Sequence, residues 1–497
     1  MAKKTINKEL TGAQDLYNFL FEACNIIRGP VSQDNFKDYI TPLLYYKRIS
    51  DVYDEETEEA LISSGGDKEY ASLPEQHRFV IPDGCHWQEV RERTENLGAA
   101  IVGAMRQIEI ANPDTLYGVL SMFSSQKWTN KAILNDSKIR DLIEHLSKRK
   151  LGNKDYPADL MGDAYEILLK KFADDSKAQA GEFYTPRSVV RLLVHILDPQ
   201  PGETVYDPAC GSGGMLIEAI RYMHDDSLCC GSIFGQEKNV VNAAIAKMNL
   251  FLHGASDFNV MQGDTLRDPK ILQGGNIAKF DCVIANPPFS LENWGATEWS
   301  SDKYKRNIYG TPSDSCGDYA WIQHMICSMS SGKGRMAVVM PQGILFRGNQ
   351  EAEIRKQLVE SDLIEAVVTL GDKLFYGTGL SPCFLIIRRM KPAHHSGRIL
   401  MIDGSKILTQ KRAQNILEEN DIDRLYSLYQ NYSDEEDYSR IVTLQEIRDK
   451  EYNLSPNRYV VYHKEEIRPY VEVLAEFKHA YEDVKRLENE FSLLINA

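Results

Sequence analysis

From residue 204 onward, short apolar runs alternate with helical segments, and this alternation restricts the chain to one class of fold. Strands are predicted in TVYD (204–207), SIFGQE (232–237), FNVMQ (258–262), FDCVIA (280–285), GRMAVVMP (334–341), LIEAVVTL (363–370) and SPCFLIIRR (381–389). Helical segments such as GMLIEAIRYM and VVNAAIAKMNLFLHG stand between the first strands. Strands and helices that alternate in this way form a mostly parallel sheet covered on both faces. The sequence therefore predicts an α/β domain, whose ligands bind at the carboxyl ends of the strands.

The segments before and after this domain have a different pattern. Residues 11–150 carry apolar side chains at three- and four-residue spacing, which predicts helices at 16–29 and 38–57. The pattern fades after about residue 410, where the acidic stretch 431–440 indicates a mobile segment. We therefore expect three parts: an N-terminal helical domain (1–158), the sheet domain (159–412) and a C-terminal extension (413–497).

The last 30 residues predict a strong amphipathic helix. Its apolar side chains recur at steps of three, four or seven: Leu474, Phe477, Tyr481, Val484, Phe491 and Leu494. Such a stripe is typical of a helix packed on its own domain, and equally of a coiled-coil-like helix that docks on a partner. The spacing alone leaves both interpretations open.

Composition limits the compartment and the partners. The N-terminal MAKKTINKELTGAQ has no apolar core, no run reaches membrane-spanning length, and the nine cysteines include no CxxC pair. We expect reduced thiols, a cytoplasmic location, no membrane association and no zinc site. The formal net charge of −15 does not suit a nucleic-acid binder. A DNA-acting chain of this kind would need a local basic face or a basic partner.

A glycine-rich turn, DPACGSGG, follows the first predicted strand. Glycines there let the backbone approach a ligand closely. The turn is not a phosphate-binding Walker loop, because the chain contains no GxxxxGK. The next strand ends in Glu237, suited to ribose hydroxyls, and the third is followed by Asp264, placed to contact an adenine amine. Together these features predict a ligand that contains adenosine.

The fourth predicted strand ends on Asn286, Pro287, Pro288 and Phe289. The prolines fix the backbone and remove two donors, so carbonyl oxygens stay free to accept hydrogen bonds. The Asn286 side-chain oxygen and the Pro287 carbonyl would accept the two N–H groups of an exocyclic amine, while Phe289 would stack on a flipped base. Such bonds would aim the nitrogen lone pair at an electrophile, and S-adenosylmethionine combines a ribose with a transferable methyl. The competing interpretation is a strand-capping turn with a core phenylalanine.

These motifs resemble those of amino-group DNA methyltransferases, most closely the modification subunit of Type I restriction-modification systems. Further similar segments are GEFYTPR (181–187), GDYAWIQHMI (317–326), AVVMPQGILFRG (337–348), LFYGTGLSPCFLIIRR (374–389) and YNLSPNRYV (452–460). The resemblance implies a Rossmann-like S-adenosylmethionine-dependent methyltransferase sheet with an N-terminal helical domain and a C-terminal helical extension. The final Phe289 replaces a tyrosine common in related enzymes, and stacking survives that change.

The resemblance also implies roles for single residues. Those implied to contact S-adenosylmethionine are Glu182, Phe183, Tyr184, Thr185, Pro186, Arg187, Asp207, Ala209, Gly211, Ser212, Gly213, Gly214, Glu237 and Asp264. The catalytic residues it implies are Asn286, Pro287, Pro288 and Phe289. No metal ligand is implied.

The expected reaction is methylation of adenine N6 in double-stranded DNA within a complex. Little sequence after the last sheet strand could read bases, so a separate specificity subunit is expected to do so. The resemblance implies two copies of this chain for each specificity subunit. The C-terminal helix would dock there, and the presence of a restriction subunit is left open. The alternatives are methylation of protein glutamine, methylation of cytosine N4, and a scaffold that binds DNA and cofactor without turnover.

Overall fold

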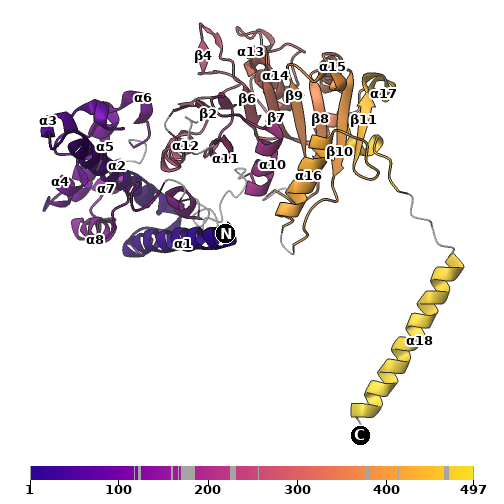
Figure 1. The fold of residues 1–497 in the computed structure, drawn as a ribbon, viewed down its shortest axis with the longest axis horizontal. Helices are drawn as coiled ribbons and strands as arrows, with labels where there is room; N and C mark the ends of the chain where they lie inside the picture. Colours follow the sequence, from indigo (N-terminus) through magenta and orange to yellow (C-terminus); the bar gives the residue numbers. More distant parts are fainter. Residues whose placement is uncertain are drawn as a thin grey trace.

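The computed structural model of the chain describes residues 2–116, 118–120, 125–157, 160–165, 167–168, 185–223, 231–255, 257–375, 381–411, 414–463 and 470–495. Figure 1 shows the N-terminal helices gathered on one side of the molecule and the strands of a single large sheet on the other. The two parts meet near α12 (Val240–Leu252), a helix of the sheet domain.

The N-terminal part is helical, as the three- and four-residue spacing predicts. Its long helices are α1 (Ala2–Ile27), α2 (Lys37–Ser63), α5 (Leu97–Ala111) and α8 (Asp136–Leu146), and its short ones are α3 (Lys68–Ala71), α4 (Trp87–Arg91), α6 (Pro113–Leu116), α7 (Ser125–Thr129), η1 (Gln33–Asn35) and η2 (Pro74–Gln76). Asn135 begins α8 by accepting a hydrogen bond from the Lys138 N–H. The apolar faces share one buried core, which includes Leu20, Leu43 and Ile101.

This core continues into the sheet domain through α12. Met248, Phe251 and Leu252 of α12 belong to the same buried cluster as the N-terminal helices. The Tyr45 ring packs edge-on against the Phe251 ring, with centroids 5.1 Å apart. The Arg78 guanidinium lies over the same Phe251 ring, 4.7 Å from its centroid. The N-terminal helices are therefore packed directly on the sheet domain.

The central sheet has nine strands in the order β11-β10-β8-β9-β7-β6-β1-β2-β3. Their bounds are β1 (Val205–Asp207), β2 (Ile233–Glu237), β3 (Phe258–Gln262), β6 (Cys282–Ala285), β7 (Arg335–Pro341), β8 (Ile364–Leu370), β9 (Pro382–Arg388), β10 (Arg398–Gly404) and β11 (Ser439–Thr443). Neighbours pair in parallel, except that β9 is antiparallel to β7 and β8, and β11 to β10. The predicted α/β class with a Rossmann-like sheet is confirmed.

Each strand feeds two cores, because successive side chains point to opposite faces. In β6, Cys282 and Ile284 belong to the core under α10 (Arg187–Leu197), α11 (Gly214–Met223) and α16 (Glu419–Asn431). Val283 and Ala285 belong to the core under α14 (Asp318–Ser328) and α15 (Asn349–Glu360). Burial on both faces explains why the strands read as continuous apolar runs.

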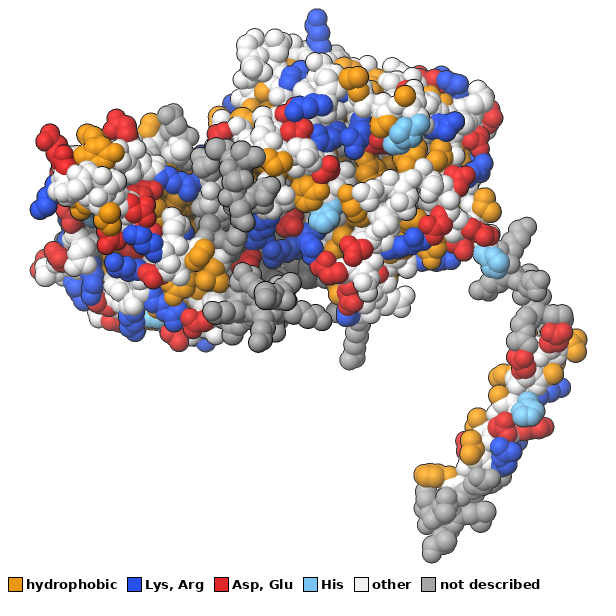
Figure 2. Space-filling model, viewed as in Figure 1, with side chains coloured by type: hydrophobic (Ala, Val, Ile, Leu, Met, Phe, Trp, Pro, Cys, Tyr) orange, Lys and Arg blue, Asp and Glu red, His pale blue; other side chains and the backbone are white. Residues whose placement is uncertain are grey.

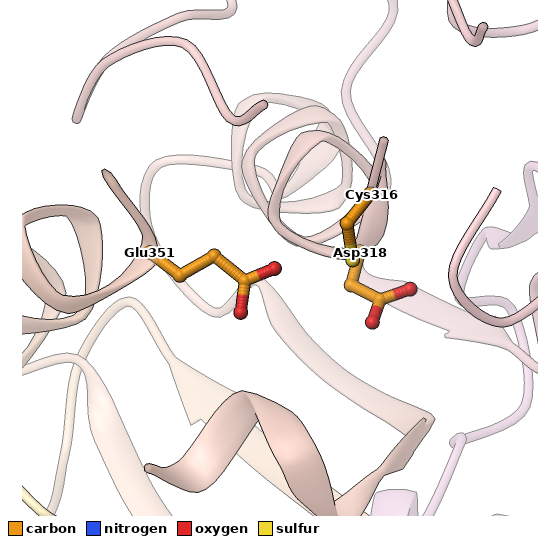
Figure 3. Close-up of side chains that lie close together, drawn as sticks. All are labelled: Cys316, Asp318 and Glu351. Carbon is orange, nitrogen blue, oxygen red and sulfur yellow. The ribbon is translucent and has the colours of Figure 1, made fainter. Parts of the chain in front are cut away.

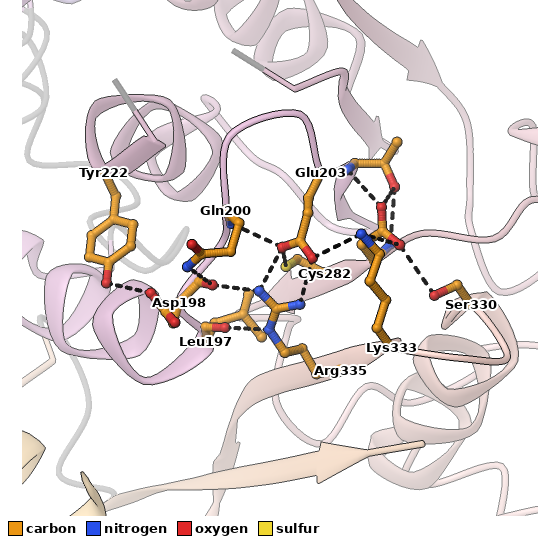
Figure 4. A network of polar contacts seen from close by, with 11 residues as sticks. Leu197, Asp198, Gln200, Glu203, Tyr222, Cys282, Ser330, Lys333 and Arg335 are labelled. Carbon is orange, nitrogen blue, oxygen red and sulfur yellow. Dashed lines mark hydrogen bonds and ion pairs between the residues drawn. The ribbon is translucent and has the colours of Figure 1, made fainter. Parts of the chain in front are cut away.

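The amino ends of β1, β6 and β7 are tied together by a polar network (Figure 4). Arg335 begins β7, and its guanidinium donates to the Leu197 carbonyl and to both carboxylate oxygens of Glu203, at 3.2 and 2.7 Å. Thr204 donates to Asp281 beside them at 3.1 Å. Burial alone would raise the pKa of Glu203, but the hydrogen bonds from Arg335 and the Gln200 N–H outweigh it and hold that pKa at about 2.

Residues after 412, expected to form an extension, add to the sheet and its cover. Helix α16 packs on one face, β11 pairs with the edge strand β10, and α17 (Leu444–Asp449) and η5 (Pro456–Arg458) follow. The acidic stretch 431–440, expected to be mobile, is a hydrogen-bonded turn in which Asp434 accepts from the Ile441 N–H at 2.6 Å. Short elements elsewhere are β4 (Leu272–Gln273), β5 (Asn276–Ile277), α13 (Ala296–Ser300), η3 (Gln342–Leu345) and η4 (Ala393–His395).

The last element is the predicted amphipathic helix, α18 (Tyr470–Ile495). Its apolar side chains are exposed, including Phe477 at 67 % and Phe491 at 65 %. Figure 2 shows them along the described part of α18, interleaved with charged side chains. Within the described residues, this helix is therefore not packed on its own domain. In the same part of the chain, no helix combines the length and apolar character that crossing a membrane requires.

Candidate active site

A pocket opens at the carboxyl ends of β1 and β6, with about 610 Å³ of empty space that includes open solvent. Its lining comes from the start of α10, the turn after β1, the start of α11 and the residue after β6: Thr185, Arg187, Val190, Asp207, Ala209, Cys210, Gly211, Ser212, Gly214, Met215, Glu218 and Asn286. The sheet thus brings together motifs that lie about a hundred residues apart in the sequence.

The glycine-rich turn shapes one wall of this pocket. Gly211 and Gly213 have φ angles of +54° and +87°, in the left-handed region that glycine adopts without strain. A Cβ on Gly211 or Gly214 would meet nothing within 4 Å, so these positions leave open space. A Cβ on Gly213 would lie 3.4 Å from Ala246, against α12. The turn therefore packs on one side and leaves backbone accessible on the other.

Asp207 ends β1 with a carboxyl that is 2 % exposed. Its Oδ1 accepts a hydrogen bond from the Ala209 N–H at 2.9 Å. Burial raises the pKa of Asp207 to about 8, and the nearby negative charge of Glu237 contributes to the rise. At neutral pH the Asp207 carboxyl therefore holds a proton. A cationic ligand in the pocket would favour the release of that proton.

The two acids expected to contact a nucleoside hold turns beside the pocket and are not part of its lining. Glu237 accepts from the Gly211 N–H at 3.0 Å and from the Asn239 N–H at 2.7 Å. Asp264 forms an ion pair with Lys238 at 2.9 Å. Glu237 therefore braces the glycine-rich turn, and Asp264 lies beyond β3 at the same edge of the sheet.

Asn286 directly follows β6 and has an oriented side chain. Its Nδ2 donates to the Thr185 Oγ1 at 2.7 Å. Its Oδ1 is buried and, among the described residues, has no hydrogen-bond partner. A buried acceptor without a partner costs free energy, and a ligand that donates a hydrogen bond would remove that cost. The amide is thus held in place beside the pocket, and its buried oxygen has a hydrogen bond left to accept.

The rest of the motif continues away from the pocket lining. Pro287 is buried, while Pro288 and Phe289 are half-buried. The Phe289 ring lies 6.4 Å from the Phe375 ring, centroid to centroid, at an interplanar angle of 54°. The side chain packs at the margin of the core under α10. An aromatic ring is therefore held near the carboxyl end of β6, three residues after Asn286 in the sequence.

Eight of the predicted cofactor and catalytic residues line the pocket: Thr185, Arg187, Asp207, Ala209, Gly211, Ser212, Gly214 and Asn286. Pro186, Gly213, Glu237, Asp264, Pro287, Pro288 and Phe289 lie outside the lining. Glu182, Phe183 and Tyr184 lie outside the described residues. The geometry groups the motifs, and the contacts assigned to individual residues stay predictions.

Four lining residues were not anticipated: Val190, Cys210, Met215 and Glu218. Two of them could have been found from helical spacing. Val190 lies three residues after Arg187 at the start of α10, and Glu218 lies four residues after Gly214 at the start of α11. Residues three and four apart share one helix face. The same rule marks both as neighbours of residues already assigned to the pocket.

Comparison with known families defines the class of protein. Residues 156–467 match the family model described as N-6 DNA Methylase, which spans more than half of the chain. Residues 16–146 match the HsdM N-terminal domain. The sheet domain and the N-terminal helices therefore correspond to two known modules. The fold and its site are those of an N6 DNA methyltransferase.

Individual relatives narrow this class. The chain is 35% identical over 471 residues to the Type I restriction enzyme MjaVII methylase subunit of Methanocaldococcus jannaschii, covering 90% of this chain and 78% of that one. It is 31% identical over 360 residues to the HindI methylase subunit of Haemophilus influenzae, covering 70% and 76%. The chain belongs to the family of Type I restriction enzyme methylase subunits, and it is an adenine-specific DNA methyltransferase.

A solved structure agrees with this assignment. The type I restriction-modification system methyltransferase subunit from Streptococcus thermophilus superposes with a TM-score of 0.76 at 26% identity, covering 91% of this chain and 100% of that one. Membership of the N6 DNA methylases implies the use of S-adenosylmethionine as methyl donor.

Proposed function

We propose that the pocket between β1 and β6 binds S-adenosylmethionine and that Asn286, Pro287 and Phe289 hold a target adenine flipped out of duplex DNA. The observation that carries this proposal is the Asn286 amide. Its Nδ2 is engaged by Thr185 at 2.7 Å, which leaves the buried Oδ1 as an available acceptor. An exocyclic amine with two N–H groups is the complement of such an acceptor beside a free backbone carbonyl.

The residues of the pocket suit an adenosine-containing methyl donor. Gly211 and Gly214 leave space where any other residue would place a side chain. The Asp207 carboxyl, with a pKa of about 8, can lose its proton when a cationic group binds nearby. In this proposal the stretch Glu182–Arg187, the turn from Asp207 to Gly214, and Glu237 bind the donor, with Glu237 on the ribose hydroxyls and Asp264 near the adenine.

The transfer depends on how the protein holds the amine. Asn286 Oδ1 and the Pro287 carbonyl accept the two N–H groups of adenine N6 and draw the nitrogen toward tetrahedral geometry. Its lone pair then points into the pocket, where bound S-adenosylmethionine supplies an electrophilic methyl group. Phe289 stacks on the base and keeps it out of the duplex. Thr185 fixes the Asn286 amide, so no reorganisation is needed at the moment of reaction.

The partners in this proposal are double-stranded DNA and a DNA-specificity subunit, with two copies of this chain for each specificity subunit. The net charge of −15 makes strong binding to DNA phosphates by this chain alone unfavourable. The exposed apolar stripe of α18 offers a surface for helix-to-helix docking on the specificity subunit. A restriction subunit would join as a further component. The complex would act in the cytoplasm.

The test is methylation in vitro with methyl-labelled S-adenosylmethionine and unmodified duplex DNA. One sample contains the chain alone and the other its co-purified partners, and the DNA is digested to nucleosides. N6-methyladenine that forms only with partners supports the whole proposal. The same product from the chain alone would contradict the need for a specificity subunit. Labelled methylcytosine, or label on protein instead of DNA, would overturn the assignment of the Asn286 site to adenine.

A further inference from the structure

A buried acidic cluster lies next to the catalytic motif. Cys316 directly precedes Gly317, the residue before α14, Asp318 begins α14, and Glu351 is in the first turn of α15. Their potential ligand atoms all lie within 4.8 Å of one another, and Figure 3 shows the side chains converging. Asp318 is 1 % exposed and Glu351 is 5 % exposed. Two buried carboxylates so close together need a positive charge beside them.

The positive charge comes from Arg347. The guanidinium donates to the Asp318 Oδ2 at 2.8 Å, the Glu351 Oε1 at 3.0 Å and the Cys316 Sγ at 2.7 Å. Gly343 makes room for it, because a Cβ there would lie 2.3 Å from the Arg347 Nε. Burial alone would lower the pKa of Arg347, but the bond to Asp318 and the charges of both carboxylates raise it above its ordinary value.

The second oxygen of Asp318 reaches the catalytic segment. Asp318 Oδ1 accepts from the Ser290 N–H at 2.7 Å, and Ser290 directly follows Phe289. Ser290 has a φ of +51°, a left-handed conformation that a serine adopts only when its surroundings impose it. Beside it, the Gly317 N–H donates to the Leu291 carbonyl at 3.0 Å. The start of α14 therefore holds the chain in a reversal immediately after Phe289.

We infer that Asp318 and Arg347 are positioning residues for the target base. Arg347 fixes the Asp318 carboxylate, Asp318 fixes the Ser290 N–H, and the resulting turn fixes the Phe289 ring on which the flipped adenine stacks. This inference rests on the proposed role of Phe289. Neither Asp318, Arg347 nor Ser290 lines the donor pocket. Loosening this chain of contacts should therefore disturb the base without disturbing the methyl donor.

The kinetic signature of this role is specific. Binding of the duplex depends mainly on phosphate contacts and on the partner subunit. Base stacking contributes after the duplex is bound, when the adenine leaves the helix. A misplaced Phe289 ring should therefore lower kcat, by between about 10-fold and 100-fold, with little change in DNA affinity. The affinity for S-adenosylmethionine should stay within about two-fold of the unaltered protein, since its pocket is intact.

The experiment uses the full complex with Asp318→Ala, Arg347→Gln, Arg347→Lys and the double variant Asp318→Ala/Arg347→Gln. The matched control is Arg335→Gln, which removes an arginine paired with a buried carboxylate, Glu203, at the amino end of β7. The target adenine is first located by sequencing methylated DNA and is then replaced by 2-aminopurine, whose fluorescence reports flipping. Measurements are kcat, DNA and donor affinities, 2-aminopurine fluorescence, and hydrogen exchange of the Ser290 amide.

Asp318→Ala and Arg347→Gln should lower kcat and the 2-aminopurine signal for base flipping. Asp318→Ala should also remove the protection of the Ser290 amide against hydrogen exchange. The kcat and flipping signal of Arg347→Lys should lie between those of these two variants and those of the unaltered protein, because lysine cannot reproduce the planar set of N–H donors of a guanidinium. The double variant should be no worse than Asp318→Ala, because Arg347 acts through Asp318. Arg335→Gln should keep kcat and the flipping signal in its folded fraction.

Normal kcat and flipping in the folded Asp318→Ala and Arg347→Gln variants would overturn the inference. So would an unchanged exchange rate of the Ser290 amide in Asp318→Ala. An unaltered complex that makes no N6-methyladenine would instead defeat the proposed function. In that case the exchange measurement alone decides whether Asp318 holds the turn.

Discussion

Arg335 begins strand β7, and Arg347 lies beyond its carboxyl end, after η3; both arginines pair with buried carboxylates, but in very different surroundings. At the amino end, Arg335 satisfies Glu203 and two backbone carbonyls, and among the described residues no buried polar side-chain atom of this pair lacks a partner. At the carboxyl end, Arg347 compensates Asp318 and Glu351, but Glu351 Oε2 and the nearby Asn286 Oδ1 have no partner among the described residues. The polar atoms of the Arg335–Glu203 pair are thus all satisfied, whereas Glu351 and Asn286 each keep a buried oxygen without a partner among the described residues.

The pKa values of two acids express the same difference. Glu203 at the amino edge is held at a pKa of about 2 by Arg335 and backbone bonds, which outweigh the effect of burial. Asp207 at the carboxyl edge is raised to a pKa of about 8 by burial. An acid stabilised in its charged form supports the fold, whereas an acid kept protonated by burial is typical of a site that awaits a ligand. Within one sheet, the charged Glu203 therefore stabilises the fold, whereas the protonated Asp207 belongs to the candidate site.

The largest expected effect is at the carboxyl edge. Asn286→Ala should lower methylation about 10³-fold, because the transition state loses the oriented acceptor for the amine. The free energy of unfolding and the affinity for S-adenosylmethionine should change little. Labelled-methyl transfer and calorimetric titration of the donor measure the two quantities.

The control for this variant is Asn112→Ala, which removes a buried asparagine of the N-terminal helical part, one that donates to the Val80 carbonyl at 2.8 Å. It should leave methylation per folded molecule unchanged. Normal turnover by Asn286→Ala would contradict the catalytic assignment of this residue. The carboxyl ends of the strands would then no longer be distinguished from the amino ends by a catalytic side chain.

The next effect is at the amino edge. Arg335→Gln should lower the free energy of unfolding by about 3 kcal/mol, because it leaves the buried Glu203 carboxylate with only the exposed Lys333 as a charged partner. Methylation per folded molecule should be unaltered. Urea denaturation followed by circular dichroism measures the change. Arg448→Gln breaks an exposed arginine–glutamate pair and should leave the unfolding midpoint where it is. A large loss of kcat in folded Arg335→Gln would show that the polar network at the amino ends of the strands also affects catalysis at their carboxyl ends.

A smaller effect is the opposite pH dependence of the two acids. Glu203 has a lowered pKa, so its stabilising contribution is complete above about pH 4.5 and is lost as the pH falls toward 2. Asp207 has a raised pKa, so the folded chain holds a proton that the unfolded chain releases, and stability falls as the pH rises from about 4 to 8. Urea midpoints from pH 3 to 9 measure both slopes.

Two variants isolate these slopes. Asp207→Asn should flatten the decline between pH 4 and 8, and Glu203→Gln should flatten the loss below pH 4.5. Equal slopes in Asp207→Asn and the unaltered protein would mean that Asp207 is charged in the folded chain. The contrast between the two ends of the strands would then rest on the unpaired oxygens of Asn286 and Glu351.

The smallest effect on stability is expected for removal of residues 470–497. The apolar side chains of α18 are exposed, with Val471 at 75 % and Phe477 at 67 %, so the sheet loses little buried area. The unfolding midpoint should stay unchanged, while co-purification of the specificity subunit should be lost. Pull-down and urea denaturation measure the two. Retained co-purification would contradict the docking role, and a lowered midpoint would mean that α18 packs on its own domain.

Local patterns were enough to predict much of the sheet. The apolar runs of β6 and β7 and the turn DPACGSGG identified strands and their ligand-binding ends, because burial on both faces and close backbone approach leave direct marks in sequence. Helical spacing predicted α1, α2 and α18 in the same way. The strand order could not be predicted. β9 inserts between β7 and β8 in antiparallel orientation, and β11 forms an edge beyond residue 412.

The sequence by itself determined which residue types end each strand, and hence the chemistry available at the carboxyl edge. Only the tertiary structure decided how those side chains are held. Thr185 orients Asn286 across 101 positions of sequence, and Arg347 reaches Ser290 through Asp318. The physical reason is that periodicity encodes the face on which a residue lies, whereas a hydrogen bond requires two atoms within about 3 Å, a condition set by packing of the whole sheet.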